Sequence, residues 1–139
     1  MSQDDNKAAV RRYWEGFNAH NLDVWDEVCS SNHINHDPGL PVPDADLKTI
    51  KEIIGGMLAA FPNLDSSEDD LICEGDKIVV RRTFRGTHKG EFMGVAASGN
   101  EVTFGGIFIS RFAGSKMEEQ WVVFDALGVM RQIGGIPSP

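Results

Sequence analysis

Two stretches near the C-terminus alternate apolar and polar residues with a period of two. They cover residues 101–112 and 116–125, and Ala113-Gly114-Ser115 lies between them. Alternation on both sides of a short turn that contains glycine predicts a β-hairpin. We expect the rest of the chain to cover the sheet to which this hairpin belongs.

The register of the hairpin decides which side chains face the interior. A shift of one residue in the connecting loop changes which faces of the two strands lie together, and the sequence leaves this choice open. One face of the first strand carries Phe104, Gly106, Phe108, Ser110 and Phe112, and the other carries Ile107, Ile109 and Arg111. In the second strand Gln120, Val122 and Phe124 alternate with Trp121, Val123 and Asp125.

Amphipathic helices are predicted in the first half of the chain. Ser2 and Asp5 form a capping box, and the apolar residues that follow have helical spacing. Asn21 is expected to cap a second, short helix. The stripe of the first helix comprises Val10, Tyr13, Trp14 and Phe17.

A third helix is expected to begin after Asp44 or Asp46 and to end at Pro62. Two adjacent glycines, Gly55 and Gly56, lie in its middle and lower its intrinsic helicity. Close packing against a neighbouring element is the first interpretation of these glycines, and room for a ligand is the second.

Further strands are predicted at residues 32–36, 64–74 and 77–87. Helices that precede a meander of antiparallel strands indicate an α+β fold, here expected as one domain over residues 1–139. A strongly curved sheet around the helices would form a cone with an apolar pocket inside it.

Charge and composition exclude several classes of partner. The net charge of −8 argues against nucleic acid and anionic membranes as partners. No apolar run approaches the roughly 20 residues that a membrane-spanning helix needs. Cys29 and Cys73 are far apart and are expected to be free thiols, so a cytoplasmic location is predicted.

Asp125 and His36 are the candidate acid/base residues, Asp125 because it ends a hairpin strand. The structural alternative for Asp125 is a pair with an arginine or a cap on the short tail that starts at Ala126. A metal site at His33 and His36 is disfavoured, because a strand directs residues three apart to opposite faces. His36 is instead expected to face inward and to act as acid, base or hydrogen-bond donor.

Arg81 and Arg82 are adjacent in a strand, so one of them must point inward and needs an anionic partner. Asp125 and Glu119 are the candidates for that partner. The aromatic residues Tyr13, Trp14 and Phe17 are interpreted first as core, and second as the lining of a ligand cavity.

Five strings of the chain resemble the SnoaL-like polyketide cyclase (ester cyclase) family of the nuclear transport factor 2-like superfamily. They are NKAAVRRYWEGFNAHNLDVWDEV, NHDP, EGDKIVVRRTFRGTHKGEFMGV, GGIFISRF and EEQWVVFDALGVMRQIG, and the similarity extends over about residues 6–134. The resemblance implies an α+β cone with a deep hydrophobic cavity and a homodimer formed through the sheet. It also implies a cofactor-free intramolecular aldol condensation of a polyketide ester, in which a carboxylate moves the proton.

The resemblance also implies roles for individual residues. The family pairs a histidine on the first hairpin strand with an aspartate on the second, and these positions fall near Phe108 and Val122, which cannot move a proton. Arg82 stands where the family commonly has an aromatic residue. The residues that match the family pattern are His36, Arg81, His88, Trp121 and Asp125.

Two functional hypotheses follow from the sequence. The first is a cyclase-type or related isomerising or hydrolysing enzyme that uses Asp125 or His36, without metal or cofactor, on a small hydrophobic molecule. The second is a non-catalytic dimer of the same fold that binds such a molecule. The expected substrate-binding residues are Arg81, Arg82, Trp121, His88, Phe108, Tyr13, Trp14 and Phe17.

Overall fold

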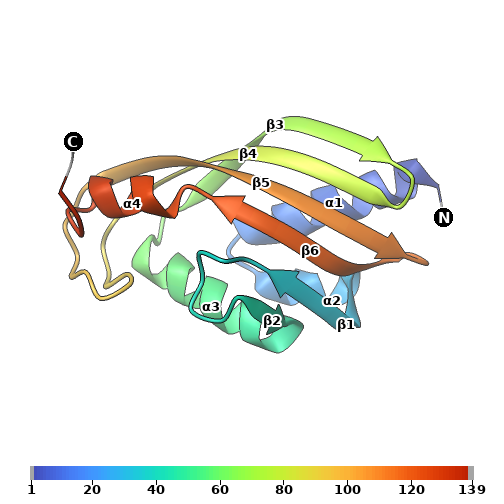
Figure 1. Cartoon of the computed structure of the whole chain (residues 1–139), viewed down its shortest axis with the longest axis horizontal. Helices are drawn as coiled ribbons and strands as arrows, with labels where there is room; N and C mark the ends of the chain where they lie inside the picture. Colours follow the sequence, from blue (N-terminus) through green and yellow to red (C-terminus); the bar gives the residue numbers. More distant parts are fainter. Residues whose placement is uncertain (1, 138–139) are drawn as a thin grey trace.

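A curved sheet of six strands forms one layer of the protein in a computed structural model that describes residues 2–137 (Figure 1). The strand order is β2-β1-β6-β5-β4-β3, and all neighbours are antiparallel except β1 and β6. The strands are β1 (Cys29–His36), β2 (Asp44–Asp46), β3 (Asp65–Glu74), β4 (Lys77–Thr87), β5 (Glu101–Ala113) and β6 (Lys116–Phe124).

Helices cover one face of this sheet, which confirms the expected α+β class (Figure 1). Two of them run beneath the strands, and α4 follows β6 at the end of the sheet. The helices are α1 (Gln3–Asn18), the 3-10 turn η1 (Leu22–Val24), α2 (Trp25–Val28), α3 (Leu47–Ala60) and α4 (Ala126–Gln132). No helix within residues 2–137 is long and apolar enough to cross a membrane.

The helix starts follow the capping residues of the sequence. Ser2 and Asp5 form the predicted capping box of α1, and the carboxylate of Asp46 accepts a hydrogen bond from the Thr49 N–H at the start of α3. The prediction for Asn21 was wrong, because its side chain makes no capping hydrogen bond and the chain forms the short turn η1 there. The strand β2, which precedes Asp46, was not predicted.

The register of β5 and β6 resolves the choice that the sequence left open. Phe108 pairs with Val122, and Ser110 pairs with Gln120. The face of β5 that begins with Phe104 therefore lies beside the face of β6 that carries Gln120 and Val122, and both faces point toward the helices. The core forms where these faces meet the aromatic stripe of α1.

The glycines of α1 and α3 lie in different surroundings. A Cβ on Gly16 would lie 2.7 Å from the Cβ of Val24, so glycine is needed where α1 approaches η1. A Cβ on Gly55 or Gly56 would meet nothing within 4 Å. Close packing was thus the wrong interpretation of the two glycines in α3.

These two environments predict opposite effects of the same substitution. Gly16→Ala should lower the free energy of unfolding by about 1–3 kcal/mol because it forces α1 and η1 apart. Gly56→Ala should raise it by about 0.5–1 kcal/mol because alanine favours the helix. Urea denaturation of both variants checks this, and a loss of stability in Gly56→Ala would contradict the packing described here.

Candidate functional site

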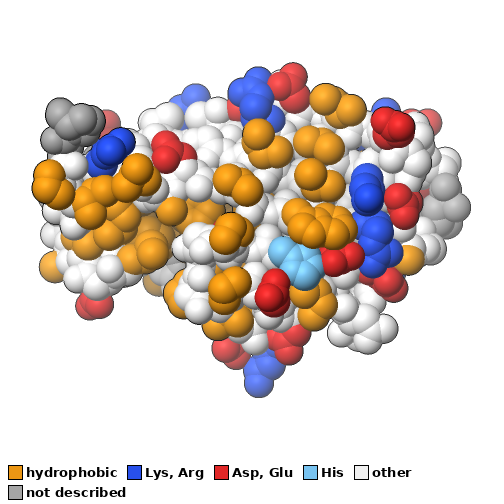
Figure 2. Space-filling model, in the orientation of Figure 1, with side chains coloured by type: hydrophobic (Ala, Val, Ile, Leu, Met, Phe, Trp, Pro, Cys, Tyr) orange, Lys and Arg blue, Asp and Glu red, His pale blue; other side chains and the backbone are white. Residues whose placement is uncertain are grey.

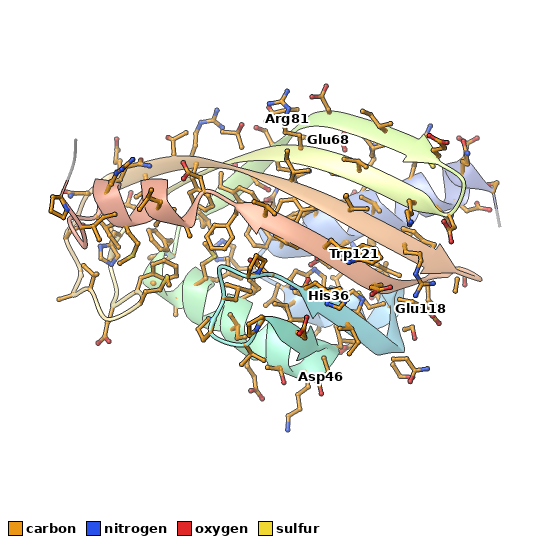
Figure 3. All side chains as sticks on the ribbon, in the orientation of Figure 1. His36, Asp46, Glu68, Arg81, Glu118 and Trp121 are labelled. Atoms are coloured by element: carbon orange, nitrogen blue, oxygen red, sulfur yellow. The ribbon has the colours of Figure 1, made fainter. Side chains whose placement is uncertain are left out.

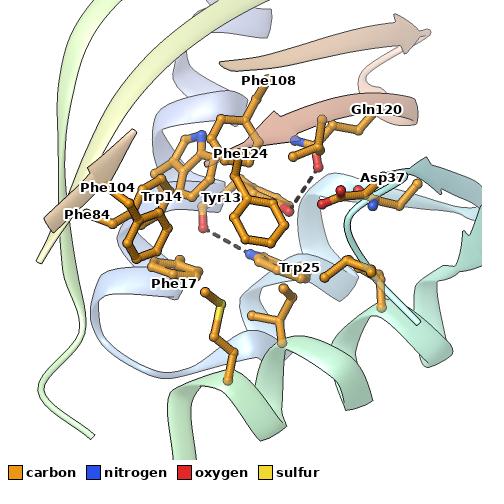
Figure 4. A pocket seen from close by; sticks show the side chains of 16 residues that line it. Tyr13, Trp14, Phe17, Trp25, Asp37, Phe84, Phe104, Phe108, Gln120 and Phe124 are labelled. Atoms are coloured by element: carbon orange, nitrogen blue, oxygen red, sulfur yellow. Dashed lines mark hydrogen bonds between the residues drawn. The ribbon is translucent and has the colours of Figure 1, made fainter. Parts of the chain in front are cut away.

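A cavity of about 50 Å³ lies between the inner face of the sheet and the helices (Figure 4). Most of its wall is aromatic or aliphatic, and its polar groups come from four side chains. The lining residues are Tyr13, Trp14, Phe17, Trp25, Asn35, Asp37, Leu40, Ile50, Ile54, Met57, Phe84, Phe104, Phe108, Gln120, Val122 and Phe124.

The strand β1 and the residue that follows it supply two of the polar groups. Side chains alternate along an extended chain, so His33, Asn35 and Asp37 share the inner side while His36 points outward. The inner three are each at most 4% exposed. Because β1 pairs in parallel with β6, Asn35 lies opposite Gln120. Two amides from different parts of the chain therefore meet at one end of the cavity.

Asp37 is a buried carboxylate without a cationic partner among the described residues. Its Oδ1 accepts a hydrogen bond from the Gly39 N–H at 2.9 Å, and no described residue donates a hydrogen bond to Oδ2. Burial raises the pKa of Asp37, and the Gly39 N–H opposes this shift in part. A buried carboxyl group whose pKa is raised holds its proton more tightly than an exposed one, as groups that accept and return protons in active sites often do.

The other two polar groups bond to one another. The Tyr13 hydroxyl donates to Gln120 Oε1 at 3.3 Å, and Gln120 Nε2 donates to Ser110 Oγ at 3.4 Å. Burial raises the pKa of Tyr13 well above its ordinary value, so its hydroxyl stays protonated. Figure 4 shows Asp37 and Gln120 on one side of the cavity and the rings of Phe84 and Phe104 on the other. The cavity thus has a polar end and an aromatic end.

Four of the predicted substrate-binding residues lie together in the cavity wall. Tyr13, Trp14 and Phe17 project from consecutive turns of α1, and Phe108 reaches the cavity from β5. Trp14 packs edge-on against Phe108, with 4.6 Å between the ring centroids. These residues serve as core and as cavity wall at once, so the two interpretations of the aromatic stripe are compatible.

Asp125 lies outside the cavity lining. Its Oδ1 accepts a hydrogen bond from the Gly128 N–H at 2.9 Å, so the carboxylate caps the N-terminus of α4. A residue after the last strand position is free to turn toward the helix that follows. The structural alternative, a cap on the tail that starts at Ala126, is therefore confirmed for Asp125.

His36 faces the outer side of the sheet and not the interior as expected (Figure 3). Its ring nitrogens lie 2.7 Å from Asp44 Oδ1 and 2.6 Å from Glu119 Oε2, and these two carboxylates raise the pKa of His36. Its ring also stacks on Trp121, which lies outside as well. Side chains alternate along the strand, and His33, three residues earlier, faces inward, so His36 faces outward.

The two adjacent arginines point to opposite faces, as expected, but their partners differ from the predicted ones. Arg81 faces outward and pairs with Asp70 at 2.8 Å. Arg82 is buried, donates to the hydroxyl and carbonyl oxygens of Ser66, and lies with its guanidinium 4.5 Å above the Trp14 ring. Trp14 stands between Arg82 and the cavity, so Arg82 supports the wall and is not part of the lining.

His88 also lies outside the cavity lining. It is fully buried, and its Nδ1 accepts a hydrogen bond from the Ser98 N–H at 3.1 Å. Its ring stacks on Phe61 at the end of α3. His88 therefore ties the loop of residues 88–100 to the helical layer.

Sequence reasoning missed the polar end of the cavity. Asp37, Asn35 and Gln120 were not among the predicted site residues. Side chains alternate between the two faces of the sheet from His33 to Asp37. Asn35 and Asp37 can therefore be assigned to the cavity once one residue of this run is known to face inward. The sequence does not show that the odd-numbered residues are the inner ones.

Comparisons with known proteins give one family. A family model described as SnoaL-like polyketide cyclase matches residues 7–133. No curated protein matches the chain.

Solved structures resemble this fold over nearly the whole chain. AclR, a candidate hydroxylase from Streptomyces galilaeus, is 25% identical with a TM-score of 0.88, covering 98% of this chain and 100% of its own. IdmH, a candidate polyketide cyclase from Streptomyces antibioticus, is 25% identical with a TM-score of 0.82, covering 93% and 98%. TsrD from Streptomyces laurentii is 24% identical with a TM-score of 0.86, covering 98% and 99%.

The burial of Asp37 predicts a pH-dependent gain of stability in Asp37→Asn. A carboxyl whose pKa is raised on folding costs stability as the pH rises from its unfolded pKa through its folded pKa. The neutral amide avoids that cost, so the variant should unfold at a higher temperature than the wild type at pH 7. The difference should shrink when the pH falls below the folded pKa. Thermal unfolding at several pH values checks this. The prediction is contradicted if the melting temperature of the variant, relative to that of the wild type, is lower at pH 7 than at pH 4.

Proposed function

The chain belongs to the SnoaL-like polyketide cyclase family, and from that premise we propose that it performs cofactor-free acid/base chemistry on a small carbonyl compound held in the cavity. The reaction is an intramolecular aldol cyclisation or a related isomerisation or hydrolysis. The observation that carries the proposal is the buried carboxyl of Asp37, with one oxygen free, at the polar end of an aromatic cavity.

Asp37 acts first as base and then as acid. Its free oxygen removes a proton from the carbon next to a carbonyl group, and the electron pair of the C–H bond moves to form an enolate. In a cyclisation the enolate carbon attacks a second carbonyl carbon of the same molecule, and a C–C bond forms. The protonated Asp37 then returns its proton to the new alkoxide oxygen, so the reaction consumes no co-reactant.

In this mechanism Asp37 moves the proton, and the two hairpin positions that the family resemblance implies do not. Phe108 and Val122 are direct partners across the β5–β6 ladder, and both line the cavity. These two positions therefore shape the cavity and move no proton. The carboxyl of Asp37 enters the same cavity from β1, on the far side of β6, which supports its use in place of the family residues.

The cavity must widen to admit a substrate. Its volume of about 50 Å³ is below the 150 Å³ of an engineered cavity that holds benzene. Leu40, Ile54 and Phe124 are half-buried lining residues, so they form the rim through which the cavity meets solvent. Leu40 belongs to the connection between β1 and β2, and Met57 in the wall is unbranched and flexible. These side chains can give way to a flat, largely apolar molecule.

Exchange of a carbon-bound proton tests the proposal without the natural substrate. The ketone 2-tetralone has an aromatic ring and an acidic C–H beside its carbonyl, and NMR follows its exchange in D₂O. The wild type should exceed the buffer rate, and Asp37→Asn should lose about 10²-fold or more because its amide cannot accept the proton. The rate should rise with pH through the raised pKa of Asp37.

Asp125→Asn is the matched control for this experiment. It makes the same change on the carboxylate that caps α4, and asparagine caps a helix about as well as aspartate, so exchange should stay within twofold of the wild type. Equal rates in the wild type and Asp37→Asn would refute the acid/base role. Binding of 2-tetralone without exchange in the wild type would favour the alternative, a non-catalytic ligand-binding dimer.

The outer face of the sheet supports a homodimer. Apolar side chains run across the strands there, and Figure 2 shows them beside His36. Ile107 is paired with Val123, and these side chains are 48% and 67% exposed. Ile72 in β3, at 63% exposure, belongs to the neighbouring row, because it pairs with Val79 and Val79 pairs with Ile109. A second copy that presents the same face would cover the stripe by two-fold symmetry.

A charge placed in this stripe should separate the two copies. Val123→Glu puts two carboxylates into the apolar contact and should shift the protein to monomer, as measured by sedimentation velocity at micromolar concentration. Leu127→Glu, which changes an apolar residue on α4 that is 52% exposed, should leave the dimer intact. A monomeric wild type would rule the dimer out.

A further inference from the structure

The amide of Asn35 at the polar end of the cavity makes no hydrogen bond with the described residues. Tyr13 gives its hydroxyl proton to Gln120, and Gln120 gives an amide proton to Ser110. The Asn35 side chain is 2% exposed and lines the cavity, yet it makes no hydrogen bond with any residue in the described range 2–137. Its amide atoms are not enclosed by protein, so a molecule in the cavity can form hydrogen bonds with them.

Asn35 stands beside a carboxylate oxygen that accepts no hydrogen bond from the described residues. Asp37 lies two residues along the same extended segment, so both side chains enter the cavity from one side, and the Cα atoms are separated by about 7 Å. The Asp37 Oδ2 has no donor among the described residues. A free amide donor and a free carboxylate acceptor thus lie next to each other in an otherwise aromatic wall.

We propose that Asn35 is a catalytic residue that donates a hydrogen bond to the carbonyl oxygen of the substrate, while Asp37 removes the proton from the adjacent carbon. This inference rests on the function proposed for Asp37 and names the substrate class, an enolisable ketone or ester. As the proton moves to Asp37, the electron pair passes to the carbonyl oxygen, and the Asn35 N–H stabilises the negative charge that develops there.

The geometry fits this class better than its competitors. A carbonyl oxygen and the carbon next to its carbonyl lie on one side of a small molecule, as Asn35 and Asp37 lie on one side of the cavity. A carboxylic acid in ionised form would place a second negative charge beside Asp37. A hydrocarbon would leave both polar groups without partners.

Paired ligands test the role of Asn35 apart from turnover. The ketone 2-tetralone and the hydrocarbon tetralin share one skeleton, so any widening of the cavity affects both alike. Quenching of the fluorescence of Trp14 and Trp25, which line the cavity, follows their binding. Asn35→Leu keeps the size of the side chain and removes the donor. It should weaken 2-tetralone binding about tenfold and leave tetralin binding within twofold.

The same variant is then assayed for proton exchange. Asn35→Leu should lower the exchange rate of saturating 2-tetralone about 10²-fold, while the pH at which the rate rises stays that of the wild type, because Asp37 remains the base. If Asn35→Leu fails to fold, Asn35→Ala gives the same comparison.

Unchanged ketone binding, or an equal loss for both ligands, overturns the role of Asn35. Loss of exchange in Asp37→Asn together with full exchange in Asn35→Leu overturns this inference and leaves the proposed function in place. A wild type that binds the ketone selectively without exchange refutes the proposed function and with it the catalytic role of Asn35, which is then a ligand-binding residue only.

Discussion

The parallel ladder between β1 and β6 joins the helical half of the chain to the meander of long strands. It places Asn35 opposite Gln120 and His36 opposite Trp121, and so fixes which residues of β1 face inward. A slip of one residue would turn Asn35 and Asp37 outward and bring His36 into the cavity. Packing resists this slip, because His33 is buried on the inner side with its Nδ1 at 3.2 Å from the Met117 carbonyl oxygen. Burial lowers the pKa of His33 and favours the uncharged ring that this position requires.

The site combines groups that a purely structural core would avoid. Asp37 is buried with no cation nearby, although Arg82 is buried beneath the same sheet. Arg82 is held by Ser66 and by the Trp14 ring, so its charge is kept away from Asp37. A pair between the two would have stabilised the ionised carboxylate and lowered its pKa. Their separation leaves the pKa of Asp37 raised by burial, at the expense of stability.

The fold could be predicted from the sequence to a greater extent than the site. The strand Lys77–Thr87 and the hairpin around Gly114 followed from alternation and turn residues, and the cap at Asp46 followed from a local hydrogen-bond rule. Such features depend on neighbours in the sequence. The inner face of β1 depends on its ladder with β6, more than 80 residues away, so His36 was placed inward and Asp37 was missed. Asp125 was misplaced for a related reason, because a strand-end carboxylate can serve either a cavity or the next helix.

The central claim is that Asp37 presents to the cavity a carboxyl that holds its proton more tightly than an ordinary aspartate. A ¹³C NMR titration of the aspartate carboxyl carbons, with Asp37 assigned by comparison with Asp37→Asn, measures this directly. We expect the Asp37 signal to titrate above the value of about 3.9 that is usual for aspartate, because burial raises its pKa, and to move when 2-tetralone binds. A titration at or below the usual value, with no response to the ketone, would contradict the account.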